Sequence, residues 1–92
     1  TRALSSAASD VYKRQEQAVE EIDIGGPCML RAAAKNYHSV LVVPGVEWYE
    51  PAMEDLKEHN MCSSLEFRQL MASRTFDATS RYDALITSYI RP

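Results

Sequence analysis

The sequence has few of the residues that build metal centres or disulfide frameworks. It contains two cysteines, Cys28 and Cys62, which lie far apart with no C-x-x-C spacing. Neither His38 nor His59 has the spacing of a zinc ligand from a cysteine, so no metal site is predicted. A disulfide between the cysteines is one possibility, but reduced, buried thiols in a cytoplasmic protein are the favoured interpretation.

Long apolar runs and an excess of basic residues are also missing. No apolar segment approaches the roughly 20 residues of a membrane-spanning helix, so no membrane association is predicted. Lys and Arg number 10 against 13 Asp and Glu, and the net charge of −3 argues against nucleic-acid binding. At 92 residues, the chain is long enough for one small domain with a modest core.

Residues 22–43 contain, in order, a glycine turn, a short helix and an apolar run. The Gly-Gly pair at 25–26 allows a sharp turn or a close approach to a ligand. Pro27 suits the first helical position, because its missing N–H needs no partner there. The predicted helix ends at Lys35. The apolar, mostly β-branched run of residues 40–43 is typical of a strand that is covered on both faces.

Helices are predicted on either side of this segment. A short helix covers residues 16–22, and another runs from about residue 47 to residue 58, with Pro51 tolerated only in its first turn. Ser63 and Glu66 have the spacing of a capping box, which predicts the start of a further helix.

The last predicted helix contains several hydroxyl residues, which favour a break or bend near residues 77–80. Beyond that point, apolar residues recur at three- and four-residue spacing, as in an amphipathic helix. The side chains predicted to be buried in the helices after residue 46 are Trp48, Met53, Leu56, Leu65, Leu70, Met71, Tyr82, Leu85, Ile86, Tyr89 and Ile90.

Two ionisable residues flank the glycine turn and the helix that follows it. Asp23 precedes the turn and Lys35 lies at the far end of the helix. A structural interpretation is open, because a helix dipole favours a lysine at its C-terminus and aspartate is common in turns. Catalysis is the alternative. An unbroken helix from Pro27 to Lys35 would place about 12 Å between its ends, which is long for a directly bonded pair.

Two separated motifs resemble one family. Residues 22–36 read IDIGGPCMLRAAAKN, and residues 64–90 contain a Ser-Leu-Glu-x-Arg and a Tyr-Asp-x-x-Ile pattern. This stretch resembles the bifunctional AICAR transformylase/IMP cyclohydrolase family of purine biosynthesis over about residues 16–92. The resemblance implies the later half of the cyclohydrolase domain, with an α/β fold. That fold is part of a methylglyoxal-synthase-like, Rossmann-like three-layer domain, mostly helical here with one strand. Residues 1–15 do not fit the family and are predicted to be an artefactual or disordered leader.

The resemblance also implies a reaction and a site. The cyclohydrolase domain closes the purine ring of formyl-AICAR to IMP with loss of water. Lys35 and Asp23 are the implied catalytic residues, and the implied nucleotide-binding residues are Asp23, Ile24, Gly25 and Asn36. No cofactor is implied for this step, whereas formyl-tetrahydrofolate serves the family's transformylase domain. A cytoplasmic homodimer is expected for the full-length enzyme.

Two other interpretations stay open at this point. One is a non-catalytic, nucleotide-binding regulatory domain of the same fold, and the other is a small helical interaction module. The motifs that build the family's phosphate and base sites are not found in this sequence. The 92-residue chain alone is therefore predicted to be inactive.

Overall fold

The computed structural model describes residue 14 and residues 16–92, and these residues form helices joined by loops. A short helical segment at residues 16–20 is followed by α2 (Gly25–Lys35), the 3₁₀ helix η1 (Val46–Trp48), α3 (Tyr49–Glu58) and α4 (Leu65–Ile90). The predicted leader, residues 1–15, lies outside the described residues except for Arg14. In the described part of the chain, no helix is both long and apolar enough to cross a membrane.

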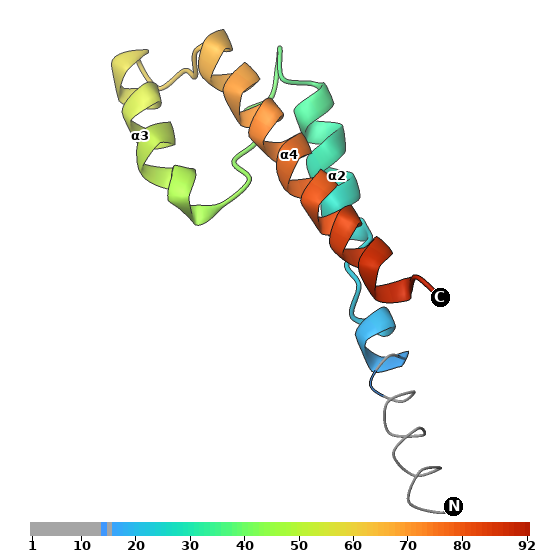
Figure 1. The fold of residues 1–92 in the computed structure, drawn as a ribbon. Helices are drawn as coiled ribbons and strands as arrows, with labels where there is room; N and C mark the ends of the chain where they lie inside the picture. The colour runs from blue at the N-terminus through green and yellow to red at the C-terminus, as the bar shows by residue number, and fades with distance from the viewer. Residues whose placement is uncertain (1–13, 15) are drawn as a thin grey trace, which may run out of the picture.

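Helices α2 and α4 lie side by side and hold the core between them (Figure 1). The buried core consists of Ala34 from α2, Val42 from the following loop, and Met71 and Ala72 from α4. The alanines allow the two helix backbones to approach closely, and Met71 fills the remaining space. The predicted burial of Met71 is confirmed.

Several other residues predicted to be buried are exposed. Met53, Leu65, Leu70 and Leu85 are each more than two-fifths exposed, and the last turn of α4 exposes Tyr89 and Ile90. These predictions were wrong because they assumed a partner for every apolar helix face, whereas α4 is covered mainly by α2. Trp48 is half-buried against the core, as predicted.

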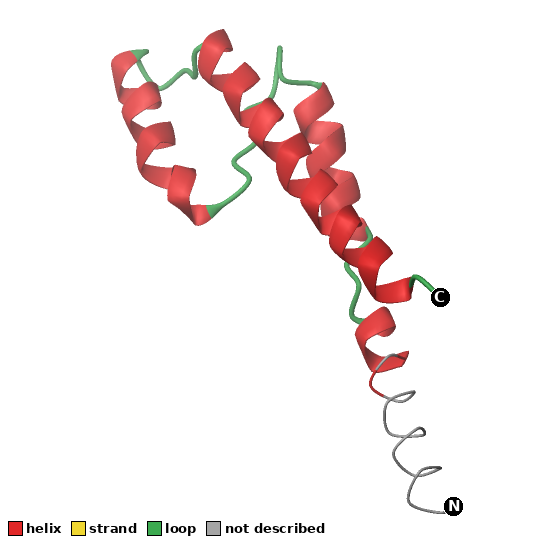
Figure 2. Ribbon diagram, viewed as in Figure 1, coloured by secondary structure: helices red, strands yellow, loops and turns green. Residues whose placement is uncertain are grey.

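The predicted strand at residues 40–43 is not formed, and Figure 2 shows no strand among the described residues. Val42 is only 6% exposed and packs against the core, so the apolar run is used for side-chain packing. A strand also needs a neighbour for its backbone groups, and the described residues offer none. The observed fold is helical, and the three-layer α/β arrangement stays a prediction.

The predicted helix at residues 47–58 is confirmed in outline. It divides into η1 and α3, and Pro51 lies in the first turn of α3 as expected. Ala52 is the buried residue of α3. The ribbon of α3 lies to one side of the pair formed by α2 and α4 (Figure 1), and Ala52 is covered there to 6% exposure.

The start of α4 is held by two residues of the Ser-Leu-Glu-x-Arg motif. Ser64 is the N-cap, and its hydroxyl accepts a 3.1 Å hydrogen bond from the backbone N–H of Phe67. The predicted capping box at Ser63 was therefore one residue too early. Arg68 donates to the carbonyls of Tyr37 and Ser63, which ties the loop after α2 to the start of α4.

Replacing Ser64 by alanine is expected to destabilise the 92-residue chain by about 1–2 kcal/mol. The substitution removes the cap and also the 2.9 Å bond that the Ser64 hydroxyl donates to Asp55 Oδ1. Urea unfolding followed by helical circular dichroism measures the loss. Ser63→Ala is the matched control and should cost less than half as much. A larger loss for Ser63→Ala would place the cap at the position that the sequence pattern predicted.

Helix α4 continues through residues 77–80, so the predicted break does not occur. The hydroxyls of Thr75 and Thr79 donate within the helix to the carbonyls of Met71 and Phe76, at 2.8 and 3.1 Å. Both threonines are buried. These internal bonds satisfy the hydroxyls without opening the helix, and packing against α2 keeps α4 continuous over 26 residues.

Candidate functional site

The predicted glycine turn is not formed, because Gly25 and Gly26 are the first two residues of α2 and neither has a positive φ. The turn that leads into α2, residues 21–24, is organised by Asp23. Its Oδ1 accepts a 2.9 Å hydrogen bond from the backbone N–H of Gly26, so the carboxylate covers the first turn of the helix. A Cβ at Gly26 would collide with Asp23 Oδ2, so a larger residue there would displace the carboxylate from this position. A Cβ at Gly25 would meet nothing within 4 Å, so the chain's own packing does not require that glycine.

Tyr82 joins this turn to α4. Its hydroxyl oxygen accepts a 2.9 Å hydrogen bond from the backbone N–H of Asp23, across 59 residues of sequence. The sequence pattern assigned Tyr82 to core packing alone, and the structure adds a polar contact. The available signal was the residue type, because a half-buried tyrosine usually finds a partner for its hydroxyl.

An open hollow of about 430 Å³ lies beside this contact. This volume falls within the range of small-molecule pockets, roughly 300–1,000 Å³. Its surface is mainly apolar, with Asp23 and Tyr82 contributing polar groups. The residues that line it are Asp23, Gly26, Pro27, Leu30, Ala78, Thr79 and Tyr82.

The predicted site residues fall into two groups at opposite ends of α2. Asp23, Ile24 and Gly25 are together and exposed at its start, whereas Lys35 and Asn36 are exposed at its end. The 11 residues of α2 correspond to about 16 Å at the α-helical rise. The structure therefore does not bring Asp23 and Lys35 together as a hydrogen-bonded pair.

At the C-terminal group, Asn36 ends the helix through its backbone. Its N–H donates to the Ala33 carbonyl at 3.1 Å, and its own carbonyl accepts from Ser39 and Val40, both at 3.0 Å. Lys35 lies in the last turn of α2, where its charge is favourable to the helix dipole. It takes part in neither ion pair of the described residues, so its ammonium group is available to a ligand.

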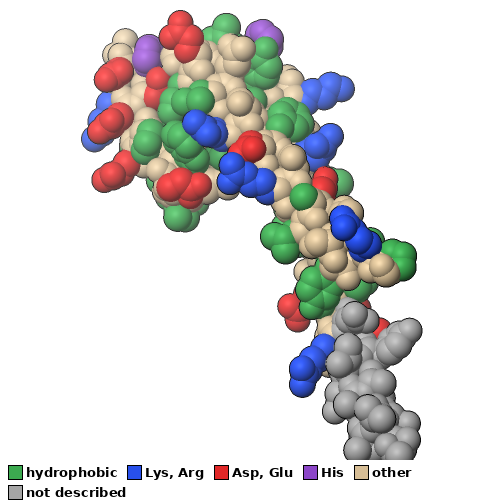
Figure 3. Space-filling view, viewed as in Figure 1, with side chains coloured by type: hydrophobic (Ala, Val, Ile, Leu, Met, Phe, Trp, Pro, Cys, Tyr) green, Lys and Arg blue, Asp and Glu red, His purple; other side chains and the backbone are tan. Residues whose placement is uncertain are grey.

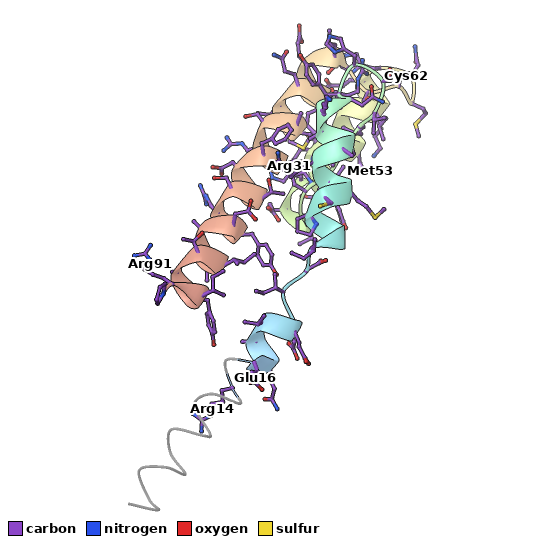
Figure 4. All side chains as sticks on the ribbon, turned by 90° about the vertical axis from the view of Figure 1, so that its right-hand side faces the viewer. Arg14, Glu16, Arg31, Met53, Cys62 and Arg91 are labelled. Atoms are coloured by element: carbon purple, nitrogen blue, oxygen red, sulfur yellow. The ribbon has the colours of Figure 1, made fainter. Side chains whose placement is uncertain are left out.

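The cysteines do not form a bond or a metal site in this structure. Both Cys28 and Cys62 are free and exposed, so the expectation of buried thiols was wrong. Figure 4 shows Cys62 at the far end of the molecule from Arg14. In the part of the chain that the structure describes, no group of three potential metal-ligating side chains occurs. On the face of the molecule that Figure 3 shows, several acidic side chains lie over α3.

Comparison with known proteins decides the family. The sequence model of the AICARFT/IMPCHase bienzyme matches residues 33–92, well over half of the chain. The chain belongs to this family.

The relatives of this AICARFT/IMPCHase chain carry the name bifunctional purine biosynthesis protein PurH. The protein of Gloeothece citriformis is 52% identical over 73 residues, which is 79% of this chain and 14% of the relative. That of Listeria welshimeri is 48% identical over 75 residues, 82% of this chain and 14% of the relative. The chain thus spans about one-seventh of the length of these relatives.

Proposed function

We propose that residues 16–92 are the later half of an IMP cyclohydrolase domain within a bifunctional enzyme of purine biosynthesis. The observation that carries this proposal is the family match over residues 33–92, which includes Lys35 in its Ala-Ala-Lys-Asn segment. The reaction would be attack of a substrate nitrogen on the formyl carbon of formyl-AICAR, followed by loss of water to give IMP. Both reacting groups belong to one molecule, so positioning supplies much of the rate.

The roles of the charged residues follow from the chemistry of that step. The Lys35 ammonium would stabilise the oxyanion that develops on the formyl oxygen and donate a proton. The Asp23 carboxylate would orient the attacking amine or accept its proton. Asp23 Oδ1 is already bonded to Gly26, and its other carboxylate oxygen accepts no hydrogen bond from the described residues. The formyl oxygen and the attacking amine are adjacent atoms, whereas α2 places about 16 Å between the two residues. In this arrangement only one of them can act at the reacting atoms, and the other would contact a different end of the substrate.

The neighbouring residues fit a nucleotide at the start of α2. Ile24 is 66% exposed, and the space above Gly25 is open, so a ligand can reach the backbone there. Asn36 would add a side-chain contact beside Lys35. The cyclohydrolase step would use no cofactor, and formyl-tetrahydrofolate would serve the transformylase region of the longer enzyme, a cytoplasmic homodimer.

The test uses a chimaera of the Gloeothece citriformis protein in which residues 16–92 of this chain replace the matching segment. We expect the chimaera to convert formyl-AICAR to IMP and to retain transformylase activity. We expect no measurable turnover from the 92-residue chain alone, because the phosphate- and base-site motifs are not in it. Conversion is followed by the change in purine absorbance.

Each outcome of this test has a definite meaning. Turnover by the 92-residue chain would contradict the predicted inactivity. A chimaera that binds the nucleotide without cyclising it, while its transformylase stays active, would favour the regulatory-domain interpretation. The helical content of the structure is the feature expected of a small interaction module, but the family match outweighs it.

A further inference from the structure

Tyr82 lies on α4 and lines two hollows, and its hydroxyl is bonded to Asp23 in the turn that leads into α2. We infer that Tyr82 is a positioning residue for Asp23 in the cyclohydrolase reaction, an inference that rests on the proposed function. It would act through the backbone of Asp23 and would not itself touch the reacting atoms.

The first argument is the way in which Asp23 is held. One hydrogen bond, from Gly26 N–H to Asp23 Oδ1, fixes the carboxylate relative to α2. A second hydrogen bond, from Asp23 N–H to the Tyr82 hydroxyl, fixes the backbone of the same residue relative to α4. Among the described residues these are the hydrogen bonds that hold Asp23, so the position of its carboxylate relative to α4 depends on Tyr82.

The second argument is the seating of the tyrosine ring. Tyr82 is half-buried and lines a second, mainly apolar hollow together with Ile22, Ile86 and Tyr89. On its other side it lines the hollow that contains Asp23. The ring therefore forms part of the wall of both hollows, and the bond from Asp23 N–H to its hydroxyl ties it to the turn. A phenylalanine would keep the ring contacts and lose only the acceptor.

The third argument is the exposure of the turn. Asp23 and Ile24 are exposed, and residues 21–24 form no regular helix. A loop of this kind has many backbone conformations unless it is tied down. A single bond to a long, continuous helix fixes its geometry relative to that helix, which is the requirement for a carboxylate that must orient a reacting amine.

The experiment measures cyclohydrolase kinetics of the chimaera and its Tyr82→Phe, Asp23→Asn and doubly substituted variants. Tyr82→Phe should lower kcat/KM by about three- to tenfold, the effect of one neutral hydrogen bond. The share of this loss that appears in kcat, relative to the share in KM, should be the same for Tyr82→Phe as for Asp23→Asn. In the Asp23→Asn background, Tyr82→Phe should have less than a twofold effect, because the carboxylate that it positions is gone.

Two controls separate positioning from loss of folding. Tyr89→Phe removes a hydroxyl from the same helix at an exposed position and should leave kcat/KM within twofold of the chimaera. The thermal unfolding midpoint of every variant should match that of the chimaera, which verifies that the cyclohydrolase domain is folded, and transformylase activity should be unchanged.

The outcomes distinguish the inference from the proposed function. If Asp23→Asn lowers cyclohydrolase activity but Tyr82→Phe behaves like Tyr89→Phe, the positioning role is overturned and the proposed function stands. If Tyr82→Phe lowers activity equally with and without the Asp23 carboxylate, Tyr82 acts independently of Asp23, and the inference is also overturned. If the chimaera lacks cyclohydrolase activity while its transformylase is intact, the proposed function fails first.

Discussion

Replacing Lys35 by alanine in the chimaera is expected to lower the cyclohydrolase kcat by about 100- to 1,000-fold, the usual loss for a group that stabilises an oxyanion. Transformylase activity should not change. Lys35 is exposed in the last turn of α2 and has no ion pair among the described residues, so removing it disturbs little of the protein's own structure. The loss would therefore report the chemical step. Steady-state kinetics with formyl-AICAR measures it.

A matched control is available on α3. Lys57 also lies exposed in the last turn of a helix, so Lys57→Ala removes the same charge from the same kind of position. We expect it to leave cyclohydrolase activity within twofold of the chimaera. Equal effects of the two substitutions, or a Lys35→Ala variant with near-normal kcat, would remove Lys35 from the catalytic site. The thermal unfolding midpoints of both variants should agree, since each lysine contributes mainly a helix-dipole interaction.

The sequence predicted the helices well because their signals are local. The Gly-Gly-Pro start and the Lys35 end of α2 depend on neighbouring residues, and the structure places that helix at Gly25–Lys35, two residues earlier at its start. The position of Pro51 likewise predicted the start of α3. The family motifs were also readable, and the polar residues Ser64 and Arg68 of the second motif proved to hold the start of α4.

The errors came from properties that depend on distant partners. An apolar run such as residues 40–43 suits either a strand or a buried loop, and only the presence of another strand decides between them. The hydrogen bond between Asp23 and Tyr82 joins residues 59 positions apart in the sequence. The helical spacing of Tyr82 indicated only core packing, so it did not predict this bond. Asp23 and Lys35 lie at opposite ends of α2, as the sequence predicted. Their catalytic roles stay a prediction, because the structure does not bring the two side chains together.

The packing between α2 and α4 gives the second large expected effect. Met71→Ala should destabilise the 92-residue chain by about 2–5 kcal/mol, because it opens a cavity in the core. Met71 is fully buried, and its core neighbours Ala34 and Ala72 are too small to fill the space that it leaves. Alanine is a good helix former, so α4 loses packing and not helix propensity. Urea unfolding followed by helical circular dichroism measures the change.

Met29→Ala is the control, since this methionine of α2 is 75% exposed and should contribute less than about 0.5 kcal/mol. Small domains are stable by only about 5–15 kcal/mol, and the exposed apolar residues of this chain place it near the lower limit. Met71→Ala is therefore expected to remove a large part of the isolated chain's stability and to lower its urea unfolding midpoint. Equal unfolding midpoints for the two variants would mean that α2 and α4 do not pack through Met71. In the chimaera, the same substitution should lower cyclohydrolase activity together with stability, whereas Lys35→Ala lowers activity alone.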